Sequence, residues 1–186
     1  MKITPSIVDD ILRNFEERGD RHYGEDVTER QHALQCATFA QRNGEAPSLV
    51  VACLLHDYGH LLHDLGEDIA EKGVDARHED VGANRLKRHF IDEVVEPIRL
   101  HVAAKRYLCW KESDYLTGLS AASRQSLGLQ GGPMNDQEGR EFESLPHYDA
   151  AVRLRRYDDM GKVTDMETTE VAEFRTLIES FVRKSA

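Results

Sequence analysis

The stretch Leu54-Leu55-His56-Asp57-Tyr58-Gly59-His60 joins an apolar segment to a His-Asp doublet, and the fold that we expect is built around it. The apolar segment follows Pro47 and covers residues 49–55, which predicts a central helix that is apolar on all sides. Imidazole is a good ligand for divalent metals such as iron and zinc, and a carboxylate can bridge two ions. The doublet is therefore a candidate metal site, provided that further ligands surround it.

Apolar residues at helical spacing predict an all-α fold, a helical bundle in one domain over residues 1–186. The sequence contains no extended alternating pattern, no repeat and no low-complexity tract. We expect residues 61–76 to form a surface connector or lid. We expect residues 113–145 to form a loop near the site that is irregular in secondary structure but ordered. The helices that we expect run from Thr4-Pro5 to Gly19, over 28–42, from Pro47 into the doublet, over 78–90, from Glu96-Pro97 through Lys105, from Pro146 through Asp158, and over 167–184.

Composition and charge argue against several classes of protein. The 186 residues are 40% hydrophobic and 31% charged, which is typical of a soluble globular domain. A net charge of -10 argues against a nucleic-acid partner. No apolar run approaches the roughly 18 residues of a membrane span, so we expect no membrane partner. Three scattered cysteines, Cys36, Cys53 and Cys109, suit a reducing compartment as ordinary thiols, and we expect a cytoplasmic protein.

Six side chains on the expected helices could surround the doublet as ligands. Four imidazoles and two carboxylates could hold two metals, with Asp57 bridging and open positions left for a substrate, as in catalytic metal sites. Any one of these histidines alone would more simply be structural, so the interpretation depends on the whole set. The candidate ligands are His32, His56, Asp57, His78, His101 and Asp158. The histidines without a matching place, expected at the surface, are His22, His63, His89 and His147.

The pattern His32…His56-Asp57…Asp158 resembles the metal-binding pattern of the HD-domain superfamily over nearly the whole chain. The added His78 and His101 are similar to its dinuclear members, which include cyclic-dinucleotide hydrolases and myo-inositol oxygenase. A narrower similarity is to the small mixed-valent di-iron oxygenases that cleave phosphonates. It is carried by residues 23–25 (Tyr-Gly-Glu), 28–35, 55–60, 101–107, 123–134 and 155–158.

This resemblance implies an oxygenase with two iron ions, Fe(II) and Fe(III), and O2 as co-substrate. It implies O2-dependent cleavage of the C–P bond in 1-hydroxy-2-aminoethylphosphonate or its N-methylated or trimethylammonio analogue, giving phosphate and glycine or a betaine. It also implies that Tyr23 occupies an iron site until substrate arrives and that Glu25 meets the substrate's amino group. The implied ligands are His32, His56, Asp57 and Asp158 for one iron, and Asp57, His78 and His101 for the other.

Helical spacing adds two candidate residues beside the ligands. His60 follows His56 by four residues, so both can share one helical face, and we expect it either to donate to the phosphonate or to support a metal ligand, not to be a seventh ligand. Lys105 follows His101 by four residues, which would place an ammonium next to the metals. A buried ammonium beside two cations needs an anion, so the arrangement predicts an anionic substrate. Asp57, His60 and Lys105 are the catalytic residues that we expect.

Further substrate contacts follow from the expected helix after Pro146 and the loop before it. Arg155 lies three residues before Asp158 and could bind phosphonate oxygens through its two-pronged guanidinium. Ser123 and Ser126 could add hydroxyl donors. A trimethylammonium end would also need aromatic faces. The candidates for these faces are Tyr23, Tyr58, Tyr107, Trp110 and Tyr115.

Three other functions use the same ligands. A phosphohydrolase acting on a nucleotide or a small phosphate ester is the main alternative, in which a metal-bound hydroxide attacks phosphorus. The chain offers no evident nucleobase pocket, and residues 23–25 would have no clear use in that reaction. An inactive, metal-dependent binding module would not need all six ligands and Lys105. Oxidation of an inositol-like ring would leave Lys105 and Arg155 without an anionic partner.

Overall fold

The fold is described from a computed structural model, which covers residues 6–22, 26–64 and 72–184. Within these ranges the chain forms helices, and its one β-type pairing is an isolated bridge between Phe90 and Val182. The expected all-α class is confirmed. The elements are α1 (Ile7–Arg18), α2 (Glu29–Arg42), α3 (Pro47–Leu55), the 3-10 helix η1 (Tyr58–Leu62), α4 (His78–Leu86), α5 (Asp92–Lys111), α6 (Tyr115–Gly118), α7 (Ala121–Leu129), α8 (Asp136–Glu143), α9 (Tyr148–Met160), the 3-10 helix η2 (Val171–Phe174) and α10 (Arg175–Glu179).

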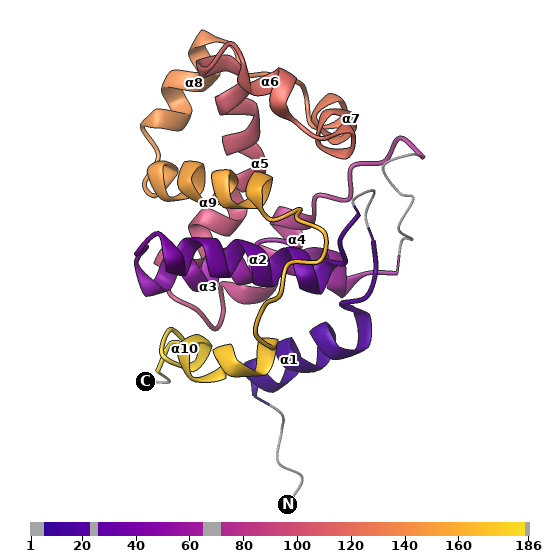
Figure 1. Cartoon of the computed structure of the whole chain (residues 1–186). Coiled ribbons are helices and arrows are strands. Elements are labelled where there is room, and N and C mark those ends of the chain that lie inside the picture. The colour runs from indigo at the N-terminus through magenta and orange to yellow at the C-terminus, as the bar shows by residue number, and fades with distance from the viewer. Residues whose placement is uncertain (1–5, 23–25, 65–71, 185–186) are drawn as a thin grey trace, which may run out of the picture.

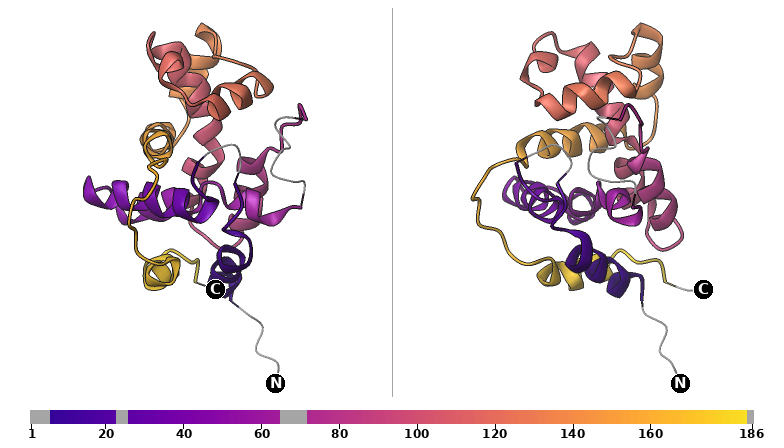
Figure 2. Two further views of the ribbon diagram at one scale, coloured as in Figure 1. Left: turned by 45° about the vertical axis from the view of Figure 1, so that its right-hand side comes forward. Right: turned by 90° about the vertical axis from the view of Figure 1, so that its right-hand side faces the viewer.

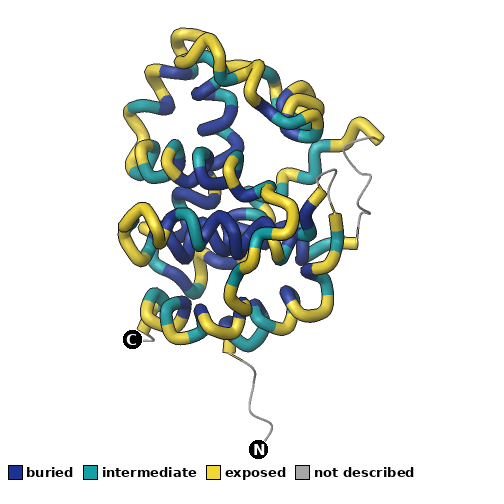
Figure 3. The backbone as a smooth tube through the Cα atoms, viewed as in Figure 1, coloured by how far each residue is buried: buried dark blue, intermediate teal, exposed yellow. Residues whose placement is uncertain are grey.

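The long helix α5 organises the arrangement of the others (Figure 1). Helices α3, α4 and α9 pack against it and α2 packs against α3 and α9, while α6, α7 and α8 gather at its far end. Helices α1 and α10 lie side by side at the opposite end of the molecule, as the turned views in Figure 2 also show. Burial is concentrated where α2, α3 and α5 meet (Figure 3). The elements that carry the candidate ligands thus meet in the core.

Helix α3 is the central helix that the apolar run predicts. Pro47 opens it at the first helical position, where a missing backbone N–H costs nothing. Every residue from Leu49 to Leu55 is buried. Each large apolar side chain buried in this way contributes about 1.5–3 kcal/mol to folding. The helix ends at Leu55, and His56 and Asp57 form the turn that follows it, with His56 still fully buried.

Several helix boundaries differ from the expected ones, and α4 ends early, at Leu86. Ser6 caps α1 and forms a capping box with Asp9, while the expected start at Thr4-Pro5 lies outside the described residues. Helix α5 begins at Asp92 and contains Pro97 in its second turn, because Val94 and Val95 are already buried in the core and hold the first turn in place. Helix α9 begins at Tyr148, two residues after the expected proline.

Two segments differ more strongly from expectation. The expected irregular loop over residues 113–145 contains three short helices, and Ser120 caps α7 by accepting a hydrogen bond from the Ser123 N–H. The expected helix over 167–184 is interrupted, since only η2 and α10 form there. The chain after α10 instead pairs with the segment between α4 and α5, where the Arg183 N–H donates to the His89 carbonyl at 2.6 Å. Among the described residues, no helix combines the length and apolar character needed to cross a bilayer.

Candidate metal centre

The structure brings the six candidate ligands into one buried cluster. Five elements supply them, so the cluster depends on the packing of the whole bundle. The two histidines His56 and His101 are almost completely buried, and Asp57 is partly accessible. His32 comes from α2, His56 and Asp57 from the turn after α3, His78 from the first residue of α4, His101 from α5 and Asp158 from α9.

The first half of the cluster is formed by two imidazoles and two carboxylates. The Nε2 atoms of His32 and His56 lie 3.1 Å apart. Asp57 Oδ2 lies 3.5 Å from His32 Nε2 and 3.3 Å from His56 Nε2. Asp158 Oδ1 lies 3.5 Å from His32 Nε2 on the other side. Four donor groups therefore surround one point.

The second half uses the other oxygen of the same aspartate. The Nε2 atoms of His78 and His101 lie 3.0 Å apart. Asp57 Oδ1 lies 3.1 Å from His78 Nε2 and 3.5 Å from His101 Nε2. Asp57 thus directs one oxygen to each histidine pair, which is the geometry of a carboxylate that bridges two ions. The second half has three candidate ligands against four in the first, so a metal ion held there would keep more positions open for a substrate.

Backbone carbonyls determine which ring nitrogen of three of the histidines carries the proton. The Nδ1 atoms of His32, His56 and His101 lie 2.8, 2.8 and 2.7 Å from the carbonyl oxygens of Gly161, Cys53 and Ile98. A carbonyl can only accept, so each Nδ1 donates, and each neutral ring directs an unprotonated Nε2 into the cluster.

Two Nε2 lone pairs about 3 Å apart repel each other unless a cation lies between them. Asp57 Oδ1 is also buried without a hydrogen-bond donor. Both features fit bound metal ions, and nitrogen and oxygen donors with open positions suit iron, manganese or zinc.

The pKa shifts of the clustered histidines and aspartates also indicate that the cluster favours bound positive charge. Burial alone would raise the pKa of Asp57, but His56 and His78 outweigh burial and hold it well below its usual value. Burial would lower the pKa of His56, yet Asp57 raises it to about 9. Burial would raise the pKa of Asp158, but Arg155 holds it well below its usual value. In the absence of metal ions, the raised pKa of His56 favours a proton on its imidazole, at a position where a metal ion is expected.

A group of cations and hydroxyls borders the cluster. Lys105 and Arg155 are each 3% exposed, which is unusual for charged side chains. Lys105 donates to Ser126 Oγ at 2.8 Å, and Arg155 NH1 donates to Asp158 Oδ2 at 2.6 Å. Ser123 Oγ lies 3.4 Å from Arg155 NH2. The expected lysine, arginine and two serines are therefore neighbours in space, although their contact with a substrate stays a prediction.

His60 lies next to the cluster, but not for the reason that we expected. Helix α3 ends before His56, so His56 and His60 do not share a helical face, and that argument was wrong. His60 belongs to η1, and its ring stacks on the His78 ring with centroids 4.1 Å apart. It therefore lies beside the second half of the cluster. His63, expected at the surface, is half-buried next to it, with ring centroids 5.9 Å apart.

The residues proposed for the cationic end of a substrate are less well defined. Tyr23 and Glu25 lie outside the described residues.

The other candidate aromatic residues have partners of their own. Tyr58 belongs to the main core and accepts from Asn14 at 2.6 Å, while Tyr115 donates to Asp159. Tyr107 and Trp110 pack with Phe142 and Lys111 at the far end of α5. Among the described aromatic residues, these four have structural partners and do not form a cage.

Sequence reasoning did not identify two residues at the site. Lys162, just after α9, donates to Ser123 Oγ at 3.0 Å and to Ser120 Oγ at 3.3 Å, adding a third cation next to Lys105 and Arg155. Glu29 is 7% exposed, and burial together with Asp57 raises its pKa to about 8. Helical spacing could have indicated Glu29, which lies three residues before His32. No pattern marked Lys162, because it lies beyond the end of its helix.

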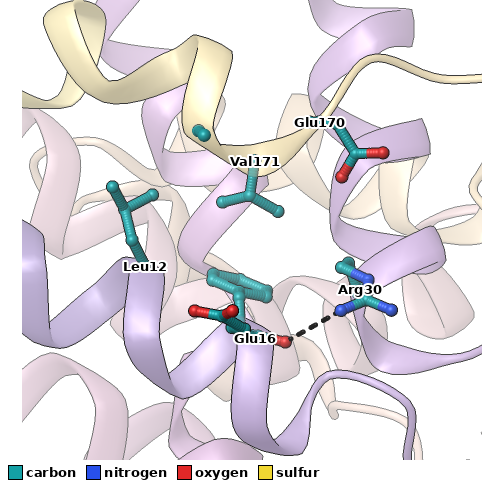
Figure 4. Close-up of a pocket in the computed structure, with 7 residues that line it drawn as sticks. Leu12, Glu16, Arg30, Glu170 and Val171 are labelled. Atoms are coloured by element: carbon teal, nitrogen blue, oxygen red, sulfur yellow. Dashed lines mark hydrogen bonds between the residues drawn. The ribbon is translucent and has the colours of Figure 1, made fainter.

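A separate hollow of about 280 Å³ lies between α1, α2 and η2 (Figure 4). Arg30 reaches across it and donates to the Phe15 carbonyl at 3.3 Å. None of the candidate ligands lines this hollow, so it is not part of the metal centre. Its lining residues are Leu12, Phe15, Glu16, Arg30, Glu170, Val171 and Ala172.

An all-α bundle with a His-Asp doublet at the end of its central helix, and with further histidines and an aspartate gathered around it, defines a metalloprotein of the HD class. Consistent with this, the HD domain family matches residues 30–116. The chain is 41% identical over 180 residues to [1-hydroxy-2-(trimethylamino)ethyl]phosphonate dioxygenase (glycine-betaine-forming) of Leisingera caerulea, covering 96% of this chain and 92% of the relative. It is 42% identical over 179 residues to hydroxymethylphosphonate dioxygenase of Gimesia maris, covering 96% and 89%. The chain belongs to the HD-domain family, in the oxygenase branch that contains these two relatives.

Proposed function

We propose that this protein is an iron-dependent dioxygenase that cleaves the carbon–phosphorus bond of a 1-hydroxyphosphonate. The observation that carries the proposal is the position of two buried cations, Lys105 and Arg155, beside the cluster of candidate ligands. Metal ions and buried cations together favour an anionic substrate. The relatives at 41% and 42% identity are named for reactions of phosphonates, which are such anions.

The proposed reaction takes up one O2 and releases inorganic phosphate and a carboxylate. A 2-amino or 2-trimethylamino substrate gives glycine or glycine betaine. The two products together hold two more oxygen atoms than the substrate, so O2 supplies both atoms and the reaction requires no external reductant.

The chain's own residues have defined parts in this proposal. Two irons, as an Fe(II)/Fe(III) pair, would be held by the six candidate ligands and would supply the binding and activation of O2, which side chains cannot perform. Lys105 and Arg155 would bind the phosphonate oxygens, with hydroxyl donors from Ser123 and Ser126. His60, beside His78, would donate a further hydrogen bond to the phosphonate. Burial of the cluster would exclude water from the reacting carbon.

The proposal is tested by loading the protein with iron under limited oxygen and measuring O2 uptake and phosphate release together. The substrates are hydroxymethylphosphonate, 1-hydroxy-2-aminoethylphosphonate and its trimethylammonio analogue. We expect phosphate release equal to O2 uptake, no release without O2, and a mixed-valent electron paramagnetic resonance signal that substrate perturbs. Phosphate-ester hydrolysis without O2, supported by manganese or zinc, would instead establish the hydrolase alternative.

A matched pair of lysine variants on α5 separates the substrate site from general effects of charge. Lys105→Met removes the buried ammonium, and Lys111→Met removes an exposed one that pairs with Glu143. We expect Lys105→Met to bind iron normally and to lose at least about tenfold in kcat/KM, since a charged hydrogen bond contributes about 1.5–3 kcal/mol. Lys111→Met should behave as the unaltered protein. Unchanged kinetics in Lys105→Met would contradict the anion-binding role.

A further inference from the structure

Gln35 is a buried glutamine whose side chain pairs with the backbone of a segment far along the chain. It is 1% exposed and lies on α2, three residues after His32 and on the same face. Its Nε2 donates to the Val163 carbonyl at 2.8 Å, and its Oε1 accepts from the Val163 N–H at 2.9 Å. Val163 is 47% exposed, so packing of its side chain does little to hold this segment. We call this pair of hydrogen bonds the Gln35 clamp.

The segment after α9 is anchored at two points, of which the clamp is the second. The first is Gly161, whose N–H donates to a carbonyl in the last turn of α9 at 2.9 Å. The Gly161 carbonyl in turn accepts from His32 Nδ1 at 2.8 Å. Lys162 lies between Gly161 and Val163. Its backbone is therefore fixed on both sides, which limits the directions that its side chain can take.

From this position Lys162 reaches the cations beside the metal centre. Its Nζ donates to Ser123 Oγ at 3.0 Å, and Arg155 NH2 lies 3.4 Å from the same oxygen. Burial lowers the pKa of Lys105, and the charges of Arg155 and Lys162 lower it further, which places all three cations in one group. Positive charges that meet at one hydroxyl repel each other, and an anion bound between them would relieve the repulsion.

The contacts of the two lysines suit a phosphonate oxygen. Lys105 donates to Ser126 Oγ at 2.8 Å, as Lys162 does to Ser123 Oγ. A hydroxyl is a neutral acceptor, and hydrogen bonds to a charged acceptor are about twice as strong. An anionic oxygen that enters this group would therefore compete well with the serines for both ammonium groups.

We propose that Lys162 is a third cation of the phosphonate site and that Gln35 is the positioning residue that holds it there. The inference rests on the proposed function for the identity of the substrate. Gln35 would not touch the substrate, since both ends of its amide bind Val163. The end of α9 holds His32 independently, so loss of the Gln35 clamp should displace Lys162 and leave the ligands in place. The expected defect is weaker substrate capture without loss of metal.

The test compares Gln35→Met, which removes the clamp, with Gln41→Met, which changes an exposed glutamine on the same helix. Lys162→Met removes the cation itself. Each variant is loaded with iron and assayed with the hydroxyphosphonate that the unaltered protein converts fastest. We expect KM to rise at least about tenfold in Lys162→Met, as for a lost charged hydrogen bond. In Gln35→Met we expect at least about threefold, because a displaced ammonium keeps part of its attraction.

The kcat and the iron content of both variants should stay close to those of the unaltered protein, and Gln41→Met should match it throughout. A rise in KM at constant kcat reports lost binding, which a general loss of structure would not produce. Iron loss from Gln35→Met, or an unchanged KM in Lys162→Met, would overturn the inference.

A double variant shows whether the glutamine acts through the lysine. Once Lys162 is absent its position no longer matters, so Gln35→Met combined with Lys162→Met should have the KM of Lys162→Met alone. Additive losses would show that Gln35 acts by another route and would overturn its positioning role. If Gln35→Met does not fold, Gln35→Glu takes its place in the comparison, since it keeps an acceptor for the Val163 N–H.

A binding measurement separates this inference from the proposed function. The probe is inorganic phosphate, titrated calorimetrically into the iron-loaded protein without O2. If the unaltered protein releases no phosphate from any hydroxyphosphonate, the proposed function fails. Weaker phosphate binding in both Lys162→Met and Gln35→Met would still support the two residues as parts of an anion site. Equal phosphate binding in the unaltered protein and both variants would overturn the inference.

Discussion

Gly59 packs directly against the backbone of His78, so closely that a Cβ on Gly59 would lie 1.9 Å from the His78 carbonyl oxygen. Gly82, one turn along α4, faces the same contact, and a Cβ there would lie 3.1 Å from the Gly59 nitrogen. Two glycines thus allow η1 and α4 to approach through their backbones. This contact sets the position of His78, the first residue of α4, relative to Asp57 at the start of η1.

Gly59→Ala should displace His78 and weaken the second half of the metal centre while sparing the first. The added methyl meets backbone atoms that cannot move aside as a side chain can, so we expect destabilisation of about 1–3 kcal/mol. Iron content should fall from two toward one per chain. Gly118→Ala is the control, since a Cβ there meets nothing within 4 Å. Full iron content in Gly59→Ala would show that α4 does not depend on this contact.

Asp57 and His78 variants should separate a bridging ligand from a terminal one. Asp57 has one oxygen near each histidine pair, so Asp57→Ala should lose both metals. His78 belongs only to the second half, and His78→Ala should keep one metal. Metal analysis of the purified proteins, together with their electron paramagnetic resonance spectra, distinguishes these outcomes. Equal retention of metal in both variants would contradict the bridge.

The side chains that the sequence correctly placed next to each other are those related by local spacing. Residues 49–55 are apolar throughout, so a buried helix over this stretch followed from composition alone, although its end at Leu55 did not. Lys105 and His101 share α5, and Arg155 and Asp158 share α9, so spacing placed each pair on one face. In these cases secondary structure alone was enough to bring two side chains together.

The features that sequence reasoning missed depend on tertiary contacts. His60 follows a helix that stops at Leu55, and the close approach of Gly59 to His78 turns the chain into η1 instead of continuing the helix. The last helix is shorter than its apolar spacing predicts, because Arg183 pairs with the carbonyls of His89 and Phe90. Such pairings join residues that are far apart in the chain, and one sequence does not show them.

Gly161 should control the orientation of His32. Its carbonyl accepts from His32 Nδ1 at 2.8 Å, and a Cβ on Gly161 would lie 2.5 Å from Cys36 Sγ and 3.2 Å from His32 Nδ1. Gly161→Ala should therefore rotate the His32 ring, lower the affinity of the first half for metal and destabilise the protein by about 1–3 kcal/mol. Adding Cys36→Ala should restore part of both losses by removing the nearest clash. If the double variant is no better than Gly161→Ala, the clash is not the cause.

The pH dependence of substrate capture should follow Lys105. Burial, reinforced by Arg155, lowers the pKa of Lys105 to about 8, although Asp158 partly opposes this shift. Lys105 is thus charged below pH 8 and neutral above it, so kcat/KM for a hydroxyphosphonate should fall as the pH rises through about 8 in the free enzyme. The guanidinium of a Lys105→Arg variant keeps its charge at high pH, and the fall should disappear from this range. Steady-state assays from pH 6.5 to about 9.5 with both proteins measure it. A profile of the unaltered protein that is flat up to pH 9, or one that falls equally in Lys105→Arg, would assign the fall to another group and remove the charged lysine from phosphonate binding.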